Sequence, residues 1–278
     1  MKNDIVRRFC KHKMNIFAFA VLILIALFCF VGPLVITQDP LKQDLLNQFA
    51  PASVTHLFGT DNLGRDIFAR MVYGGRTSMI ISLQGVIAGT LIGVLIGVFA
   101  GFYGGWLDTV LSRLIDILLA FPGLLLAIVV VAILGPGTQN TVYAIAIFSI
   151  PGIARMVRGQ VMTLRGNEYI SASRVIGESN MRIVFTHIVP NAMSQIIVNV
   201  TLNLGTAILT SSGLSFLGLG VQLPNPEWGA MLSQAREIMR SHPMSAIIPG
   251  IAITLTVLSF SLVGDGLRDA LDPRLKNT

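Results

Sequence analysis

The sequence is poor in charged residues. Aspartate, glutamate, lysine and arginine make up 12% of its 278 residues, whereas a soluble globular protein carries roughly 25%. Hydrophobic residues account for 53%, and the mean hydropathy is +0.72. This balance excludes a soluble enzyme, a nucleic-acid-binding domain and a disordered protein. We therefore expect a polytopic membrane protein whose surface meets lipid and which has no nucleic-acid partner.

Cysteine and metal-ligand patterns are also scarce. Cys10 and Cys29 are too few for a disulfide framework, and both lie in or beside the first apolar segment, so they say nothing about the redox compartment. The four histidines fall in separate segments without ligand spacing, and we expect no metal site. They are His12, His56, His187 and His242.

Catalytic motifs are missing as well. No lysine follows a glycine, so the G-x-x-x-x-G-K-[ST] phosphate-binding loop is absent and ATP hydrolysis by that route is not expected. The sequence has no H-E-x-x-H motif, and Ser215 does not sit in a G-x-S-x-G elbow. Asp265 lies too close to the end of the last apolar segment for an intramembrane protease. We predict no catalytic residue and no cofactor bound by this chain itself.

Long apolar segments define the expected fold. A helix needs roughly 20 apolar residues to cross a bilayer. Two of the segments contain breaks, near Pro122 and at Pro151, which neighbouring helices can tolerate. The first is favoured as a retained anchor over a signal peptide because it is long and lacks a small-x-small cleavage site. The prediction is an all-α protein with six transmembrane helices: 14–36, 78–101, 107–134, 140–157, 192–219 and 246–263.

Basic residues predict the orientation. With the N-terminus in the cytoplasm, fourteen of the twenty lysines and arginines fall on the cytoplasmic side and six outside, as the positive-inside rule requires. Both termini are then cytoplasmic. The expected parts are a cytoplasmic N-terminus (1–13), the first transmembrane helix (14–36), an extracytoplasmic loop (37–77), a five-helix core (78–267) with a cytoplasmic loop (160–191), and a cytoplasmic C-terminus (268–278).

Glycine recurs at every fourth residue of the second segment. Because the stripe has no side chains, the backbone of another helix can approach it closely. We favour a static contact between the two helices over a pair that moves during function. The stripe consists of Gly85, Gly89, Gly93, Gly97 and Gly101. At the start of the third segment, Asp116 lies one helical turn from Arg113, and we expect these two to pair.

The fifth segment carries a polar face. Five polar residues fall within an arc of about 80° at 100° per residue. Polar groups inside a bilayer are costly and usually face a cavity or another helix, so a pathway lining is the sharper hypothesis and interhelical hydrogen bonding the plainer one. The five are Gln195, Asn199, Asn203, Thr206 and Thr210.

The loop 160–191 predicts a docking element. Ile170 through Ile176 can form a short helix ended by Gly177, and Ile183, Val184 and Ile188 give a second amphipathic piece stopped by Pro190. Two short helices outside the lipid suggest a surface for a soluble partner. A loop that merely rests on the membrane is the alternative.

This loop resembles the coupling loop of ATP-binding-cassette (ABC) importer permeases, with its EAA-x3-G-x9-I-x-L-P motif. Gly177 and Pro190 match at the expected separation, whereas the EAA triplet reads Ser171-Ala172-Ser173. Further segments are similar to dipeptide, oligopeptide and nickel permeases, in particular to their second, C-type membrane subunit. They are LFGTDNLGRD (57–66), YGGRTS (73–78), GFYGGWLD (101–108), LAFP (119–122), LSFLGLGV (214–221) with WG (228–229), and GDGLRDALDPR (264–274).

The resemblance implies a type I importer permease of a bacterial inner membrane. It implies pairing with a homologous second permease, docking of two ATPase subunits that bind ATP and Mg²⁺, and delivery of substrate by an extracytoplasmic solute-binding protein. The ATPase-docking residues it implies are Ser171, Ala172, Ser173, Gly177 and Glu178.

The cargo stays open among several substrates. Di- and oligopeptides are favoured, with nickel or a metal chelate second. From other classes, a stand-alone secondary transporter would usually need deep ionisable residues or an internal repeat, and neither is present. A membrane scaffold without transport is a further alternative. An ABC exporter would carry long cytoplasmic helix extensions that this sequence lacks.

Overall fold

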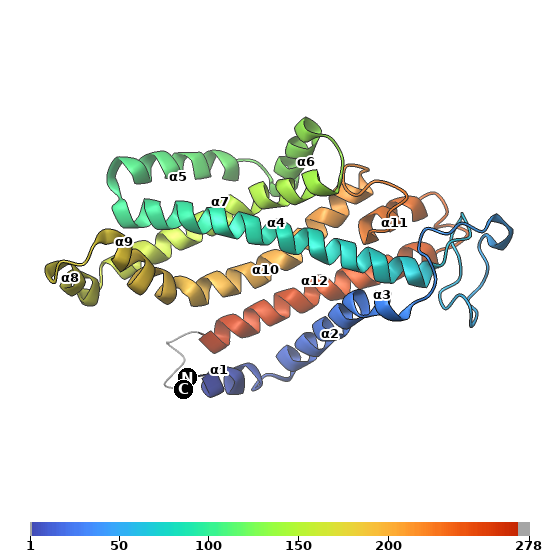
Figure 1. Cartoon of the computed structure of the whole chain (residues 1–278), viewed down its shortest axis with the longest axis horizontal. Coiled ribbons are helices and arrows are strands. Elements are labelled where there is room, and N and C mark those ends of the chain that lie inside the picture. The colour runs from blue at the N-terminus through green and yellow to red at the C-terminus, as the bar shows by residue number, and fades with distance from the viewer. Residues whose placement is uncertain (1, 272–278) are drawn as a thin grey trace.

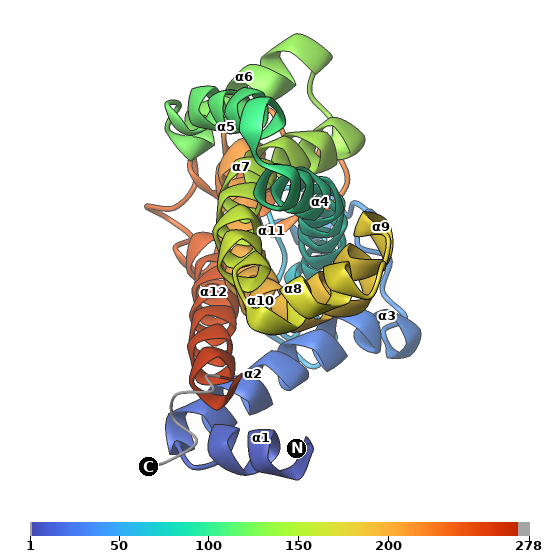
Figure 2. The ribbon, with the colours of Figure 1, turned by 90° about the vertical axis from the view of Figure 1, so that its left-hand side faces the viewer.

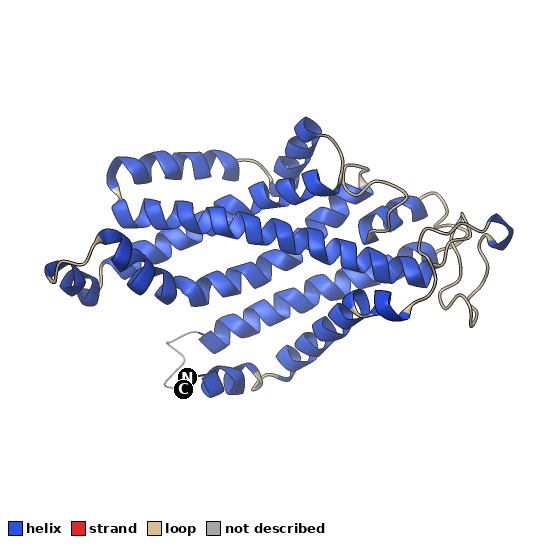
Figure 3. Cartoon of the chain, viewed as in Figure 1, coloured by secondary structure: helices blue, strands red, loops and turns tan. Residues whose placement is uncertain are grey.

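The chain folds into a bundle of long helices. The computed structural model describes residues 2–271, with side chains from Val6 onward, and no strand occurs in this range (Figure 3). The helices are α1 (Lys2–Phe9), α2 (Lys13–Phe30), α3 (Gly32–Val35), η1 (Leu45–Asn47), α4 (Ile67–Tyr103), α5 (Gly105–Leu119), α6 (Gly123–Leu134), α7 (Thr138–Arg165), α8 (Glu168–Val175), α9 (Asn180–Ile183), the π-helical η2 (Val184–Ile188), α10 (Val189–Phe216), α11 (Trp228–Ala235) and α12 (Met244–Leu271).

The bundle has two distinct ends. Helices α1 and α8 and the last turn of α12 lie at one end, which we call the α8 end (Figure 1). Helix α11 and the loop that carries η1 lie at the other, the α11 end. Viewed from the α8 end, α5 and α6 lie along one edge of the bundle and α1 and α2 along the opposite edge (Figure 2).

The glycine stripe of α4 forms the closest helix contact. A Cβ added at Gly89 would lie 2.6 Å from the carbonyl oxygen of Ala146, and one at Gly97 would lie 2.6 Å from that of Ala154. The stripe therefore packs directly on the backbone of α7, and the two helices run parallel. The predicted close backbone contact is confirmed, because only a residue without a side chain fits this spacing.

The parallel arrangement explains the broken third span. Since α4 and α7 both end near the α8 end, the chain between them must return to the α11 end. Helices α5 and α6 make this return, with a bend of 92° between them at Phe121 and Pro122. Among the described residues, five other helical segments are long and apolar enough to cross a membrane, and the bent pair, counted as one span, brings the number to six. The break falls where the sequence predicted it.

The second transmembrane helix starts earlier than predicted. Helix α4 begins at Ile67, within the expected loop 37–77 and before the expected span 78–101. Asp66 caps the helix, with its Oδ1 accepting the N–H of Ala69 at 2.6 Å. Arg70 sits in this first part yet is only 1% exposed. The hydropathy pattern missed these turns because their polar residues are neutralised by partners from other segments.

The last helix is longer than predicted. Helix α12 runs from Met244 to Leu271, beyond the expected span 246–263 and into the expected C-terminal tail 268–278. It packs on the start of α2, where a Cβ at Gly266 would clash with the side-chain nitrogen of Asn15. Residues 272–278 lie outside the described range.

Candidate functional site

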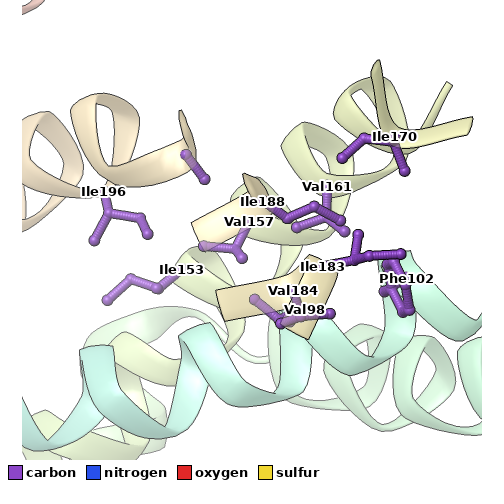
Figure 4. Packing of buried hydrophobic residues seen from close by; sticks show 11 residues of the cluster. Val98, Phe102, Ile153, Val157, Val161, Ile170, Ile183, Val184, Ile188 and Ile196 are labelled. Carbon is purple, nitrogen blue, oxygen red and sulfur yellow. The ribbon is translucent and has the colours of Figure 1, made fainter. Parts of the chain in front are cut away.

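The loop 160–191 is seated on the bundle by buried isoleucines. Ile170 of α8, Ile183 of α9 and Ile188 of η2 are fully buried, in one cluster with Phe102 of α4 and Val161 of α7. Figure 4 shows these side chains gathered between the short helices and the two long ones. Each fully buried isoleucine is worth about 1.5–3 kcal/mol relative to exposure. The loop is therefore fixed to both α4 and α7.

The tip of this loop is apolar and exposed. Val175 is 88% exposed and Ile176 is 82% exposed. The helix ends there in a Schellman motif: Gly177 has φ +89°, and its N–H and that of Glu178 donate to the carbonyls of Arg174 and Ser173. The predicted glycine stop is confirmed, and it holds two aliphatic side chains out from the bundle.

The predicted docking residues divide between the surface and the loop interior. Ser171 and Ala172 are exposed and Ser173 is half-buried. Glu178 turns inward: its carboxylate lies 3.0 Å from Nε2 of His187 and 3.6 Å from Nε of Arg182. The geometry gives Glu178 a role in bracing the loop.

Sequence reasoning passed over the two most exposed apolar residues of this loop, Val175 and Ile176. Their signal was present, because apolar side chains directly before a glycine stop in a non-membrane loop have no lipid or core to enter.

Pro190 does not stop the second amphipathic piece. The chain continues from α9 through the π turn of η2 into α10, and Pro190 lies in the first turn of α10. The N–H of Val189 bonds to the carbonyl of Val184, five residues back. A proline has no N–H to donate and its ring crowds the preceding turn, and here it is accommodated directly after the π turn. The end of the loop is thus joined to the long helix α10 without a break in helical structure.

The polar face of α10 is partly open in this chain. Thr210 is buried and donates to the carbonyl of Thr206, which itself is exposed and donates to Leu202. Gln195, Asn199 and Asn203 are half-buried, and their amides have no hydrogen-bond partner among residues 6–271. Hydrogen bonds between helices of this chain therefore do not account for the presence of these three amides in the span. The pathway lining stays a prediction.

The acidic residues of α5 pair with α7. The side chain of Asp116 accepts from Arg155 at 2.5 Å, so the predicted pairing with Arg113 is wrong. About two turns earlier in α5, Asp108 is held by both Nε and Nη2 of Arg158. Both pairs cross between helices, because α5 lies along α7 in the fold and its arginine partners come from there.

A buried ion network stands at the α11 end. Asp61 lies 2.7 Å from Nε of Arg65 and 3.5 Å from Nε of Arg70, and both guanidinium groups donate to the side chain of Gln234. Both arginines are at most 2% exposed. The network ties the loop before α4 to α11, and it accounts for part of the 57–66 motif.

Three of the histidines serve local packing. His56 lies 2.8 Å from Asp66, His187 from Glu178 as described, and the ring of His242 stacks on Phe49 with centroids 3.9 Å apart. Within the described part of the chain, no three residues of the types His, Cys, Asp and Glu gather as a metal site would need.

Comparison with known proteins identifies the family. Residues 93–277 match the family model described as the binding-protein-dependent transport system inner membrane component, and residues 2–52 match the N-terminal transmembrane domain of oligopeptide transport permease C. A dipeptide transport system permease protein of Alkalihalophilus pseudofirmus is 46% identical over 96% of this chain and 88% of its own length. A glutathione transport system permease protein of Shigella flexneri is 54% identical over 81% of this chain and 74% of its own.

Solved structures agree in fold. The inward-facing methionine ABC transporter MetNI matches with a TM-score of 0.61 at 21% identity, over 73% of this chain and 97% of that one. An amino acid ABC transporter matches with a TM-score of 0.52 at 17% identity, over 68% and 87%. The chain belongs to the binding-protein-dependent transport system inner membrane component family, as a C-type permease subunit of an ABC importer.

Proposed function

We propose that this chain is one of two permease subunits of an ABC importer that carries di- and oligopeptides across a bacterial inner membrane. The names of the two relatives above, a dipeptide and a glutathione permease, support a peptide cargo. The partners would be a homologous second permease, two ATPase subunits and an extracytoplasmic solute-binding protein. ATP and Mg²⁺ would belong to the ATPases.

The proposed orientation places the α8 end in the cytoplasm. The basic residues of the N-terminal segment, of α8 and of the end of α12 favour this side. The α11 end, with its buried Asp61 network, would then face the binding protein. Both termini would be cytoplasmic.

The exposed apolar tip of the coupling loop (residues 160–191) carries the proposal. Val175 and Ile176 project from a helix whose other face is fixed by Ile170. Two exposed aliphatic side chains on a loop that is held by buried residues fit an apolar groove in a soluble partner. Exposed apolar patches of this kind mark sites of protein–protein contact. Movement of the ATPases would be passed to α4, α7 and α10 as a rigid-body displacement, because the loop packs on the first two and continues into the third.

The polar face of α10 would line the passage. Its three amides lack partners within residues 6–271 and would meet water, substrate or the second permease. Such a lining is polar without being charged, which suits a weakly selective path for peptides chosen by the binding protein.

The test is co-purification of the tagged chain from cells that express the whole transporter. Wild type should bring down one second permease and two ATPase subunits. Val175→Asp should keep the second permease and lose the ATPases, because a carboxylate would be desolvated in an apolar groove. Gly177→Pro should act in the same direction, since φ +89° is closed to proline.

Val54→Asp is the matched control. Val54 is 97% exposed at the α11 end, so the same change of side chain there should leave the ATPases bound. Purified complexes are then reconstituted and ATP-dependent peptide uptake is measured. Retention of the ATPases by Val175→Asp, or peptide uptake by the wild-type chain without ATP, would show that the proposal is wrong.

A further inference from the structure

A second feature of the α11 end is a cavity beside the buried ion network. It has a volume of about 580 Å³ and lies between the segment that follows α3, the start of α4, the start of α7 and the segment before α11. Small-molecule sites generally measure about 300–1,000 Å³ and combine apolar walls with a few polar groups. The polar residues here include Asp39, Tyr73, Thr77, Thr138 and Asn225.

The one charged side chain that lines this cavity is acidic. Asp39 is the only ionisable carboxyl or basic side chain among its lining residues, although Lys42 and Arg76 stand close by in sequence. Asp39 accepts the N–H of Leu41 through Oδ1 at 2.8 Å, which orients the carboxylate and leaves Oδ2 unengaged among residues 6–271. The cavity therefore favours a cation that also has hydrogen-bonding groups.

The helix face under the cavity carries one further polar residue, Gln84, which follows Ile80 on the same face. Tyr73, Thr77 and Gln84 fall within an arc of about 40° on α4 at 100° per residue. Gln84 is exposed, lies within the span and has no hydrogen-bond partner among the described side chains. A glutamine amide is costly against lipid, so this face of α4 adjoins a polar space.

We propose that this cavity is a transient site for the α-ammonium end of a peptide. Asp39 would pair with the ammonium group, and the ring of Tyr73 would supply a cation–π face. Thr77, Thr138 and Asn225 would hydrogen-bond the peptide's amide and carboxylate groups. The inference rests on the proposed peptide import and adds a receiving point between the binding protein and the membrane passage.

The experiment measures weak peptide binding to the assembled transporter without its binding protein. The complete permease–ATPase complex is placed in lipid nanodiscs, and saturation-transfer NMR records the binding of alanyl-alanine and of N-acetyl-alanyl-alanine. Wild type should bind the free peptide at least fivefold more tightly than the acetylated one. Asp39→Asn should remove this preference, and Asp39→Glu should restore part of it.

Glu237→Gln is the control, because Glu237 is an exposed carboxylate at the same end that does not line the cavity. It should leave both dissociation constants unchanged. Co-purification of the second permease and an unaltered melting temperature check that Asp39→Asn folds. Equal binding of the two peptides by wild type, or an unchanged preference in Asp39→Asn, would overturn the proposal. So would protection of Asp39→Cys from thiol reagents in the peptide-free complex, since a segment of the second permease would then fill the cavity.

A second measurement distinguishes a failure of the cavity proposal from a failure of the proposed function. ATP-driven uptake of alanyl-alanine is measured in the presence of the binding protein. Uptake without Asp39-dependent binding rejects the cavity site alone. Absence of peptide uptake by a complex that transports another solute rejects the proposed cargo.

Discussion

The carboxylate of Glu227 accepts a hydrogen bond of 2.7 Å from the hydroxyl of Ser78, across 149 residues of sequence. The same carboxylate caps α11 by accepting the N–H of Ala230 at 2.9 Å. Next to it, the indole N–H of Trp228 donates to the carbonyl of Met71 at 2.9 Å. These contacts hold the segment between α10 and α12 against the start of α4. They give the Trp-Gly segment (228–229) a structural role in this contact.

Glu227 makes the stability of this clamp depend on pH. Burial raises the pKa of the Glu227 carboxyl, and the hydrogen bonds from Ser78 and the α11 backbone offset part of that rise. The native state then keeps its proton to a higher pH than the unfolded chain. Stability from this group is full below the ordinary glutamate pKa of about 4.3 and is lost as pH rises through the raised value.

We therefore expect Glu227→Gln to flatten the pH dependence of unfolding. The melting temperature in detergent is measured between pH 5 and pH 8 for wild type and variant. The advantage of Glu227→Gln over wild type should grow with pH. A constant difference across this range would contradict the raised pKa, and Glu237→Gln, at an exposed site, serves as the control.

The contact of α4 with α7 predicts a sharp difference between glycines. A Cβ at Gly89 would press on the Ala146 carbonyl at 2.6 Å, whereas a Cβ at Gly152 would meet nothing within 4 Å. Gly89→Ala should destabilise the protein by about 1–3 kcal/mol through overpacking. Gly152→Ala should be neutral or slightly stabilising, because alanine is the better helix former. Thermal unfolding checks both, and equal effects would argue against the backbone contact.

The Asp61 network predicts a large cost for removing one charge. Asp61→Asn leaves the buried guanidinium groups of Arg65 and Arg70 without their counter-charge, and breaking such a pair costs about 3–5 kcal/mol. Adding Arg65→Met should recover part of the loss, since one unpaired charge is removed. Thermal unfolding of the single and double variants gives the comparison. A loss below about 0.5 kcal/mol, typical of surface changes, would mean that the network is hydrated in the native protein.

The polar face of α10 predicts a pattern of chemical accessibility. In a background where Cys10 is replaced by serine, Asn203→Cys in the assembled transporter should react with a charged, water-soluble thiol reagent. Ile197→Cys should not react, because Ile197 is exposed on the opposite side of the helix, where lipid would cover it. Only a thiolate reacts, so labelling reports water. Equal labelling of the two positions would show that water does not lie on the Asn203 side of α10 alone.

Several features were readable from the sequence because they depend on local chemistry. The apolar lengths predicted six crossings, and Pro122 marked the break in the third. The glycine spacing of α4 predicted a close helix contact, and Gly177 predicted the end of α8. In each case the property belongs to the residue itself: hydropathy, a fixed φ, or a missing side chain.

Other features required the fold. Asp116 pairs with Arg155 because α5 lies along α7, so its neighbour in sequence is not its partner in space. The start of α4 was hidden because Arg70 is neutralised by Asp61 and by the α11 segment, which hydropathy cannot register. Pro190 continues a helix because a π turn precedes it.

The sequence by itself determined that this is a membrane protein with six apolar segments, since transfer of apolar residues into lipid is nearly additive along the chain. Only the tertiary structure decided that Val175 and Ile176 project from a fixed seat, and that Asp39 and Tyr73 line one cavity. The exposure of a side chain and the lining of a cavity depend on which distant segments of the chain pack together and exclude water. That exclusion is a property of the packed helices and cannot be assigned to any single stretch of sequence.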